Sequence, residues 1–311
     1  MIENLSAQAL KWAAAAVAAD AEVVAAKRLR GGTSSLVHAL WIRAGNAERE
    51  YVLRLFNNAE WLREEPDAAR HEAWCLETAS ALTGVKAPKL VAFDEAGDGC
   101  GMPAVLMTRL EGEVVLAPRE MERWLDGLAR ALAALHAAEA GGGARWTHAR
   151  YADAAKMDAS AWSRVPDAWT QAARIALAPP PAYEPRFIHR DFHAANVLWS
   201  GGEVSGIVDW PNGCIGAPGL DVGHCRADLA QLHGPAAADA FLDAYRRHAG
   251  EAFAYHPYWD FVSLIDIAYW EPDVFGGWTE LGAQGLTKAL IVERLDDYVR
   301  GLLARTSARR A

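Results

Sequence analysis

The segment from Phe187 to Asp209 constrains this chain more than any other part of it. His189 and Asp191 directly follow the apolar pair Phe187-Ile188, which we read as the end of a buried strand. Asn196 comes five residues after Asp191, and Asp209 comes thirteen residues after Asn196. The segment therefore predicts a loop that carries two carboxylates and one amide at the ends of short strands.

A β-hairpin is predicted between the amide and the second carboxylate. Residues 197–199 and 204–208 are largely apolar, and they flank the turn-forming sequence Ser200-Gly201-Gly202-Glu203. A hairpin returns the chain to its starting point. Asn196, at its start, and Asp209, at its end, are therefore expected to lie close together.

This set of side chains suits phosphoryl transfer. Asp191 can accept a proton from a substrate hydroxyl. Asn196 and Asp209 offer the oxygen ligands that Mg²⁺ prefers when it also binds phosphate oxygens and water. Singly, Asp191 could cap a turn and Asn196 could make an Asx-turn; the hairpin and the terminal Asp209 favour the catalytic interpretation.

The order H-x-D-x(4)-N followed by D resembles the catalytic and metal-binding loops of the protein-kinase-like superfamily, and its flanks resemble the aminoglycoside phosphotransferase (choline-kinase-like) family. The resemblance extends from about Val24 onward. It implies an α+β, bilobal protein-kinase-like fold, with a small antiparallel-sheet N-lobe and a mainly helical C-lobe. The nucleotide-binding lobe would span residues 1–108 and the catalytic and acceptor-binding lobe residues 109–311. It further implies that the protein requires Mg²⁺ and uses ATP or GTP as co-substrate.

The resemblance also assigns residues that would bind the nucleotide. Arg54, in the alternating strand predicted over residues 50–56, stands where protein kinases place a phosphate-binding lysine. Glu72, on a helix predicted over residues 66–82, resembles its ion-pairing glutamate. The remaining positions form a small-residue turn that would cover the nucleotide and a hinge after the strand predicted at residues 103–107: Gly31, Gly32, Thr33, Ser34, Met107 and Arg109.

Two further residues are expected to support the catalytic loop. His189 is interpreted as a buried scaffold residue, and Asp221 as an aspartate that holds the loop through backbone N–H groups, although an N-cap fits the residue type equally well. Asp221 lies in a run, residues 213–223, that is predicted to open a helix continuing through Leu232. The chain departs from the family at Arg190, where glycine is more common, and at Pro211.

The acceptor is expected to bind beside the C-terminal helices. Acidic residues there alternate with tryptophans, and carboxylates can bind ammonium groups while aromatic faces stack on sugar rings. The alternative is that the tryptophans are core and the acids are solvated. The candidate acceptor residues are Asp266, Trp270, Glu271 and Asp273.

Two other functions compete with a small-molecule kinase. A non-catalytic kinase-like nucleotide-binding protein would be expected to lack one of the three metal or base positions, and none is lacking. A metal-dependent hydrolase could use His189, Asp191 and His193, with His224 or His233 completing the ligand set. That interpretation leaves Asn196 and the hairpin without a role.

Composition limits the binding partners and the cellular compartment that we expect. The formal net charge of −9 argues against a general nucleic-acid binder and fits a cationic or neutral small acceptor. The four cysteines are scattered without a C-x-x-C pair, which favours reduced thiols in the cytoplasm. The apolar stretch from Trp12 to Ala19 is predicted to be a helix of a soluble protein, and no stretch approaches the roughly 20 apolar residues needed to span a bilayer. Oligomeric state is left open.

Overall fold

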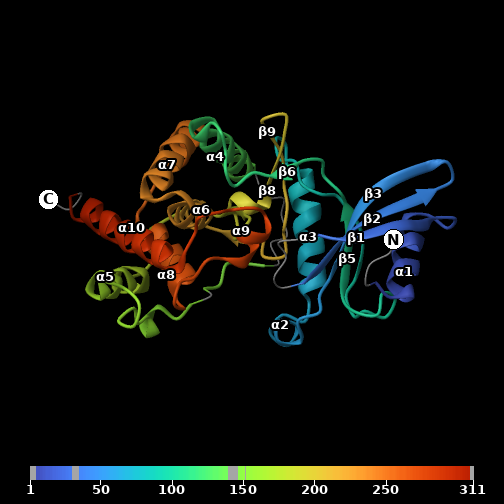
Figure 1. Ribbon diagram of the computed structural model, residues 1–311, viewed down its shortest axis with the longest axis horizontal. Helices are drawn as coiled ribbons and strands as arrows, with labels where there is room; N and C mark the ends of the chain where they lie inside the picture. Colours follow the sequence, from blue (N-terminus) through green and yellow to red (C-terminus); the bar gives the residue numbers. More distant parts are fainter. Residues whose placement is uncertain (1–4, 30–34, 139–145, 151, 309–311) are drawn as a thin grey trace.

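The structure is a computed structural model that describes residues 5–29, 35–138, 146–150 and 152–308. Its five-stranded sheet lies at one end of an elongated molecule and most of its helices lie at the other (Figure 1). This arrangement confirms the predicted α+β, two-lobed kinase-like fold. The predicted lobe boundary after residue 108 falls at the end of strand β5.

The N-lobe is built on one antiparallel sheet with strand order β1-β2-β3-β5-β4. Apolar side chains on one face of the sheet, among them Leu40, Ile42, Leu53 and Leu106, are buried against helix α1 (Ala7–Val17). The Ser6 hydroxyl caps α1 by accepting a hydrogen bond from the backbone N–H of Ala9. The strands are β1 (Glu22–Arg28), β2 (Leu36–Ala44), β3 (Ala47–Leu55), β4 (Leu90–Asp94) and β5 (Ala104–Thr108).

Helix α3 (Ala68–Ala81) lies between the sheet and the C-lobe (Figure 1). The His71 ring stacks on Trp146 and its Nε2 lies 2.6 Å from the carbonyl oxygen of Gly213. The Cys75 thiol donates to the same carbonyl at 3.2 Å. Helix α3 is thereby attached to the segment that follows the hairpin. The short helix α2 (Ala59–Glu64) precedes it.

The predicted hairpin forms at the junction of the lobes. Strand β8 (Val197–Ser200) pairs antiparallel with β9 (Glu203–Ile207), and β6 (Glu113–Val114) pairs with the other edge of β8. Strand β7 (Arg186–Ile188) pairs instead with β10 (Cys214–Gly216). Residues 214–216 were expected to open a helix, but they lie in register with β7, and helix α6 begins only at Pro218.

The C-lobe is a set of helices around α6 (Pro218–His233), which is buried along nearly its whole length. Helix α4 packs against α7, and α6 packs against both α7 and α8. The other helices of the C-lobe are α4 (Met121–Ala137), α5 (Pro166–Leu177), α7 (Pro235–Ala249), α8 (Tyr258–Ala268), α9 (Gly276–Glu280) and α10 (Lys288–Ala308). Single 3₁₀ turns are η1 (Ala154–Lys156), η2 (Ala194–Asn196) and η3 (Gly250–Ala252).

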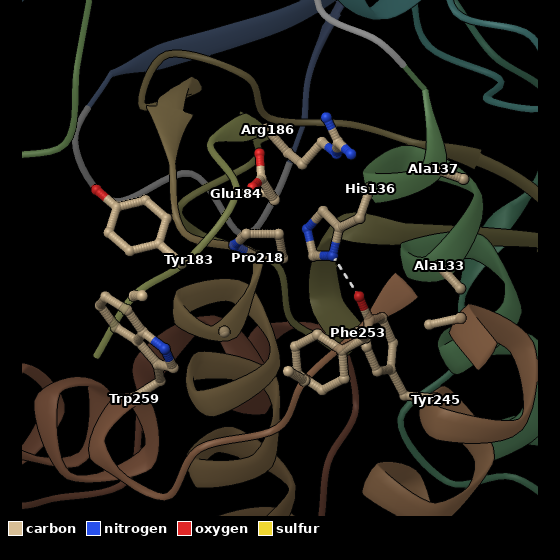
Figure 2. A pocket seen from close by; sticks show the side chains of 14 residues that line it. Ala133, His136, Ala137, Tyr183, Glu184, Arg186, Pro218, Tyr245, Phe253 and Trp259 are labelled. Atoms are coloured by element: carbon tan, nitrogen blue, oxygen red, sulfur yellow. Dashed lines mark hydrogen bonds between the residues drawn. The ribbon is translucent and has the colours of Figure 1, made fainter. Parts of the chain in front are cut away.

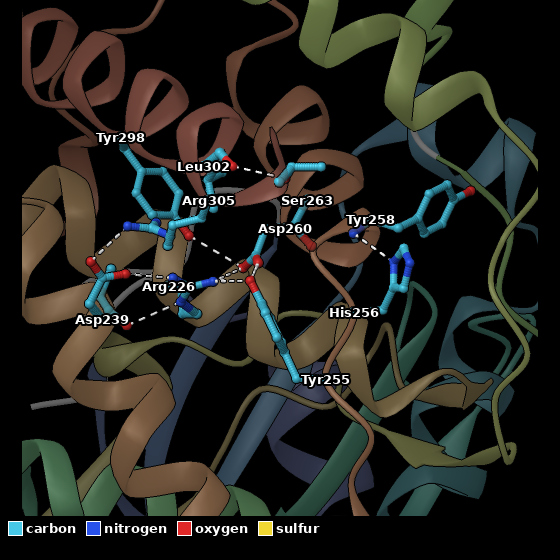
Figure 3. Close-up of polar contacts among 12 residues, drawn as sticks. Arg226, Asp239, Tyr255, His256, Tyr258, Asp260, Ser263, Tyr298, Leu302 and Arg305 are labelled. Atoms are coloured by element: carbon cyan, nitrogen blue, oxygen red, sulfur yellow. Dashed lines mark hydrogen bonds and ion pairs between the residues drawn. The ribbon is translucent and has the colours of Figure 1, made fainter. Parts of the chain in front are cut away.

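A buried ionic cluster connects α6, α7, α8 and α10 (Figure 3). The Arg226 guanidinium is fully buried and forms ion pairs with Asp260 and, at 2.7 Å, with Asp239. Tyr255 and Tyr298 both donate to Asp260. Because each buried charge has an opposite partner and further hydrogen bonds, the cluster can stay charged inside the lobe. Asp260 follows Trp259 in the sequence, and its carboxylate is paired with Arg226 inside the lobe.

In the part of the chain that the structure describes, no helix is both long enough and apolar enough to cross a membrane.

Candidate active site

The loop that carries Asp191 is held in place by Asp221 at the start of α6. One Asp221 oxygen accepts the backbone N–H of His189 and the other accepts that of Arg190, each at 2.7 Å. Asp221 is fully buried, so both bonds form in a low-dielectric environment where an acceptor charge strengthens them. The aspartate predicted to brace the loop therefore binds the backbone N–H groups of the two residues that directly precede Asp191.

A histidine on α4 completes the environment of Asp221. His136 Nε2 lies 3.1 Å from the Asp221 carboxylate, and His136 Nδ1 lies 2.7 Å from the Tyr245 hydroxyl. Burial raises the pKa of Asp221, but the hydrogen bond and charge of His136 and the neighbouring His189 outweigh it, so the net pKa is lowered. The carboxylate is therefore ionised when it holds the loop.

Two side-chain-bearing residues of this region have left-handed backbone conformations, Arg190 with φ of 71° and Asp209 with φ of 70°. Residues other than glycine adopt such angles at a cost of about 1 kcal/mol or more. The angle at Arg190 explains why glycine suits this position, and the bond from its N–H to Asp221 stabilises the conformation. At Asp209 the same turn ends the hairpin.

Two histidines surround the Asp191 carboxylate. His224 Nε2, on α6, lies 3.2 Å from Asp191 Oδ1, and His193 Nε2 lies 3.7 Å from the same oxygen. Burial raises the pKa of Asp191, but His193 and His224 lower it by more, and the net pKa falls well below its usual range. Burial lowers the pKa of His224, but the hydrogen bond to Asp191 dominates and raises it. Asp191 is thus an ionised hydrogen-bond acceptor.

Asn196 and Asp209 lie side by side at the open end of the hairpin, because Val208 N–H donates to the Asn196 carbonyl at 2.9 Å. The Asn196 amide nitrogen donates to the backbone oxygen of Asp191 at 2.9 Å. With this amide orientation the Asn196 side-chain oxygen has no donor among the described residues, and one Asp209 oxygen, Oδ1, accepts from Arg54. The side-chain oxygen of Asn196 and Oδ2 of Asp209 are therefore available as ligands, and this pair of oxygen ligands fits Mg²⁺.

Arg54 connects the two lobes through this site. Its Nη2 donates to Asp209 Oδ1 at 2.6 Å, its Nη1 donates to the Ser35 hydroxyl at 2.8 Å, and its Nε lies 3.0 Å from Glu72 Oε2. The Glu72 contact is an ion pair without hydrogen-bond geometry, and neither Glu72 oxygen has a hydrogen-bond partner in the part of the chain that the structure describes. Burial therefore raises the pKa of Glu72 to about 7, although Arg54 opposes the shift.

A cleft of about 390 Å³ runs between the lobes over these residues. Arg54, Asp191, Asn196 and Asp209 line it, together with apolar side chains of both lobes. Met107 and Arg109 also line it, and Arg109 forms an ion pair with Glu50. The predicted loop residues Gly31, Gly32, Thr33 and Ser34 lie outside the described residues.

A second cavity, of about 560 Å³, opens on the other side of Asp191. Trp270, Glu271 and Asp273, three of the candidate acceptor residues, line it, and Trp270 is 79% exposed. Glu271 forms an ion pair with Lys288 at 2.8 Å. Asp266 does not line this cavity; it accepts the backbone N–H of Ala152 and lies in a small neighbouring cavity with Arg190.

Sequence reasoning missed three polar residues that line this second cavity. They are Asp228, Gln231 and His224, the last of which contacts Asp191. All three belong to α6, and their spacing of four and three residues puts them on one face of a helix. That spacing of polar residues in an otherwise apolar helix was the available signal.

A third cavity, of about 400 Å³, lies on the far side of His136 (Figure 2). Tyr183 and Trp259 form one wall in edge-to-face contact, and Tyr245 and Phe253 form another. Asp191, Asn196 and Asp209 do not line this cavity, so it does not belong to the catalytic site.

The transition-metal alternative finds no support in the geometry. His189 Nε2 lies 3.0 Å from the carbonyl oxygen of Val208, so this hydrogen bond takes up the nitrogen that a metal ion would need. Within residues 5–29, 35–138, 146–150 and 152–308, no group of three or more His, Cys, Asp or Glu side chains is arranged to bind a metal ion.

Comparison with known proteins agrees with this geometry. The model of the phosphotransferase enzyme family matches residues 25–261. The chain belongs to this family. A curated homoserine kinase from Methylobacterium nodulans is 35% identical over 135 residues, a match that covers 40% of this chain and 41% of that protein. The chain thus matches about two fifths of the length of that relative.

Solved structures of aminoglycoside phosphotransferases share the fold. A thermostable mutant of APH(4)-Ia, in ternary complex with AMP-PNP and hygromycin B, superimposes with a TM-score of 0.62 at 18% identity and covers 95% of this chain and 98% of that one. The gentamicin complex of APH(2")-IIa gives a TM-score of 0.57 at 17% identity, with 96% of each chain covered. At these identities the likeness establishes the kinase-like fold.

Proposed function

We propose that this member of the phosphotransferase family is a small-molecule kinase, which transfers the γ-phosphoryl group of ATP or GTP to a hydroxyl of a small acceptor. The observation that carries the proposal is the position of Asp191. It lies between a cleft lined by Arg54, Asn196 and Asp209 and a separate acidic cavity. A nucleotide in the cleft and an acceptor in the cavity would meet at this carboxylate.

Each residue then has a chemical role. Asp191 accepts a hydrogen bond from the acceptor hydroxyl and orients its oxygen toward the phosphoryl group. Because the pKa of Asp191 is lowered, the carboxylate is a weak base, and orientation contributes more than early proton removal. This suits phosphoryl transfer, in which the protein acts mainly by positioning and electrostatics. Arg54, held by Glu72, would bind phosphate oxygens.

Mg²⁺ fits beside Asn196 and Asp209, and when bound it would neutralise charge on the phosphates. Asn196 and Asp209 would bind it through one oxygen each. Arg54, which contacts Asp209 directly, would keep this carboxylate at the edge of the cleft.

The class of acceptor is supported by the acidic cavity and by the relatives. The homoserine kinase is named for an amino alcohol, and the aminoglycoside phosphotransferases were solved with hygromycin B and gentamicin. We therefore propose a polyhydroxylated or amino-bearing acceptor. The four cysteines are all buried thiols, which fits the cytoplasm as the proposed compartment.

The test is a screen for phosphorylated product. The purified protein is incubated with Mg²⁺ and ATP or GTP and a panel of aminoglycosides, macrolides and amino alcohols including homoserine, and products are identified by mass spectrometry. At least one phosphorylated acceptor is expected, and its formation should require Asp191. Nucleotide binding without transfer to any acceptor would favour the non-catalytic alternative.

A further inference from the structure

Helix α6 carries a stripe of polar side chains on one face. Its members are Asp221, His224, Asp228 and Gln231, spaced by three, four and three residues, so they follow the helical period of 3.6. Asp221 and His224 already have functions in the site, since the first holds the catalytic loop and the second contacts Asp191. The stripe continues one turn further, to Asp228, along the wall of the second cavity.

Asp228 is a buried carboxylate that lacks a complete set of partners. It is 5% exposed, and its Oδ2 atom has no hydrogen-bond partner among the described residues. Buried carboxylate oxygens are normally paired, because an unpaired one loses its hydration without compensation. Since Asp228 lines the same cavity as Asp191, a ligand in that cavity can supply the missing donor.

The charges around the cavity favour a cationic donor. Four carboxylates line it, those of Asp191, Asp228, Glu271 and Asp273. The basic groups on its wall are the imidazoles of His193 and His224; both contact Asp191, and both also lie close enough to Asp228 to oppose the rise in its pKa that burial causes. Lys288 is paired with Glu271 at the exposed edge. Asp228 is therefore placed to attract a positive charge.

We propose that Asp228 binds the ammonium group of the acceptor while Asp191 binds its reacting hydroxyl, so that the acceptor contains a compact amino-alcohol unit. This inference rests on the proposed function. His224 and Asp228 are four residues apart, a rise on the order of 6 Å along α6. Because the Asp191 carboxylate contacts His224, it lies about one helical turn from Asp228, a span that an acceptor with a few carbon atoms between its nitrogen and its reacting oxygen can bridge.

The experiment compares acceptors of the same size with and without an ammonium group. Aminopropanol is compared with propanediol, and L-homoserine with the hydroxy acid in which a hydroxyl replaces the amine. The wild-type protein should prefer the amine of each pair. In Asp228→Asn, which keeps the shape and removes the charge, this preference in kcat/KM should fall by about 10- to 100-fold, mainly through KM. The KM for ATP should not change.

Two further variants control the result. Asp228→Glu retains the charge and should retain a preference for the amine. Asp243→Asn removes an exposed carboxylate of α7 and should leave the preference unchanged. An unchanged preference for amines in a folded Asp228→Asn protein would overturn the inference.

Failure of the proposed function is distinguishable from failure of this inference. If no acceptor is phosphorylated, calorimetric binding of aminopropanol in the presence of Mg²⁺ and ADP replaces the kinetic readout. Binding that Asp228→Asn weakens would support the site while contradicting the kinase activity. Phosphorylation with no preference between amine and hydroxyl would support the kinase and contradict the site. Absence of aminopropanol binding to the wild-type protein would contradict the role of Asp228.

Discussion

Replacing Asp221 by asparagine should weaken both the fold and the catalytic loop. The carboxylate accepts two backbone N–H groups at 2.7 Å and contacts His136 at 3.1 Å, all in a fully buried position. Asparagine keeps one acceptor oxygen and turns the other into an NH₂ group that faces a donor. One charge-assisted bond is lost, and a buried donor is left without a partner.

The magnitude follows from these contacts. A hydrogen bond to a charged group contributes about 1.5–3 kcal/mol, and an unsatisfied buried donor costs about 1–3 kcal/mol. We expect Asp221→Asn to lower the free energy of unfolding by about 3 kcal/mol. Loss of the bond to Arg190 also releases its left-handed backbone, so Asp191 should lose its position and kcat should fall.

Urea denaturation monitored by circular dichroism measures the first effect, and steady-state kinetics measures the second. Asp243→Asn, an exposed replacement on α7, should stay within about 0.5 kcal/mol of the wild type. Because the pKa of Asp221 is lowered, the group is ionised throughout the range from about pH 5 to about pH 8, and the difference in stability should be constant there. An Asp221→Asn protein as stable and as active as the wild type would refute the reasoning.

Three other outcomes are expected. First, Arg226→Met should lower the free energy of unfolding by about 3–5 kcal/mol, because it leaves the Asp260 carboxylate buried without an opposite charge. The double variant Arg226→Met with Asp260→Leu should lose less stability. Equal losses for the single and the double variant in urea denaturation would contradict this. Second, the native state holds the proton of Glu72 more tightly than the unfolded state does, so stability should fall, by a contribution on the order of 3 kcal/mol, as the pH rises from 4.5 to about 7. Thermal unfolding of Glu72→Gln across that range should lack this contribution, and an unchanged pH dependence would count against the raised pKa. Third, Mg²⁺ should tighten ATP binding to the wild type and not to Asp209→Ala, as calorimetry with and without Mg²⁺ can show; equal metal dependence would place the metal elsewhere.

The sequence predicted the parts of the site that depend on local patterns. The fold class followed from the family resemblance, and the hairpin from a turn between two apolar runs; both were confirmed. The strand at residues 214–216 was missed because its partner, β7, lies about 30 residues earlier, and such pairing leaves no local periodicity.

The acceptor side was predicted less well, for a related reason. Glu271 and Asp273 were identified by their proximity in sequence to Trp270, but Asp266 beside them faces a different cavity. Asp228 was passed over because it lies in a helix that is buried almost throughout. Only the three-dimensional structure brings this helix against Asp191.

The most direct test of the account is Asp191→Asn. The carboxylate is placed to act on the acceptor rather than on the nucleotide. The variant should therefore bind ATP with Mg²⁺ as the wild type does, within about twofold by calorimetry, while transfer to the best acceptor falls by roughly 10²- to 10⁴-fold. Transfer at a rate near that of the wild type, with the variant folded and nucleotide bound, would contradict the central role assigned to Asp191.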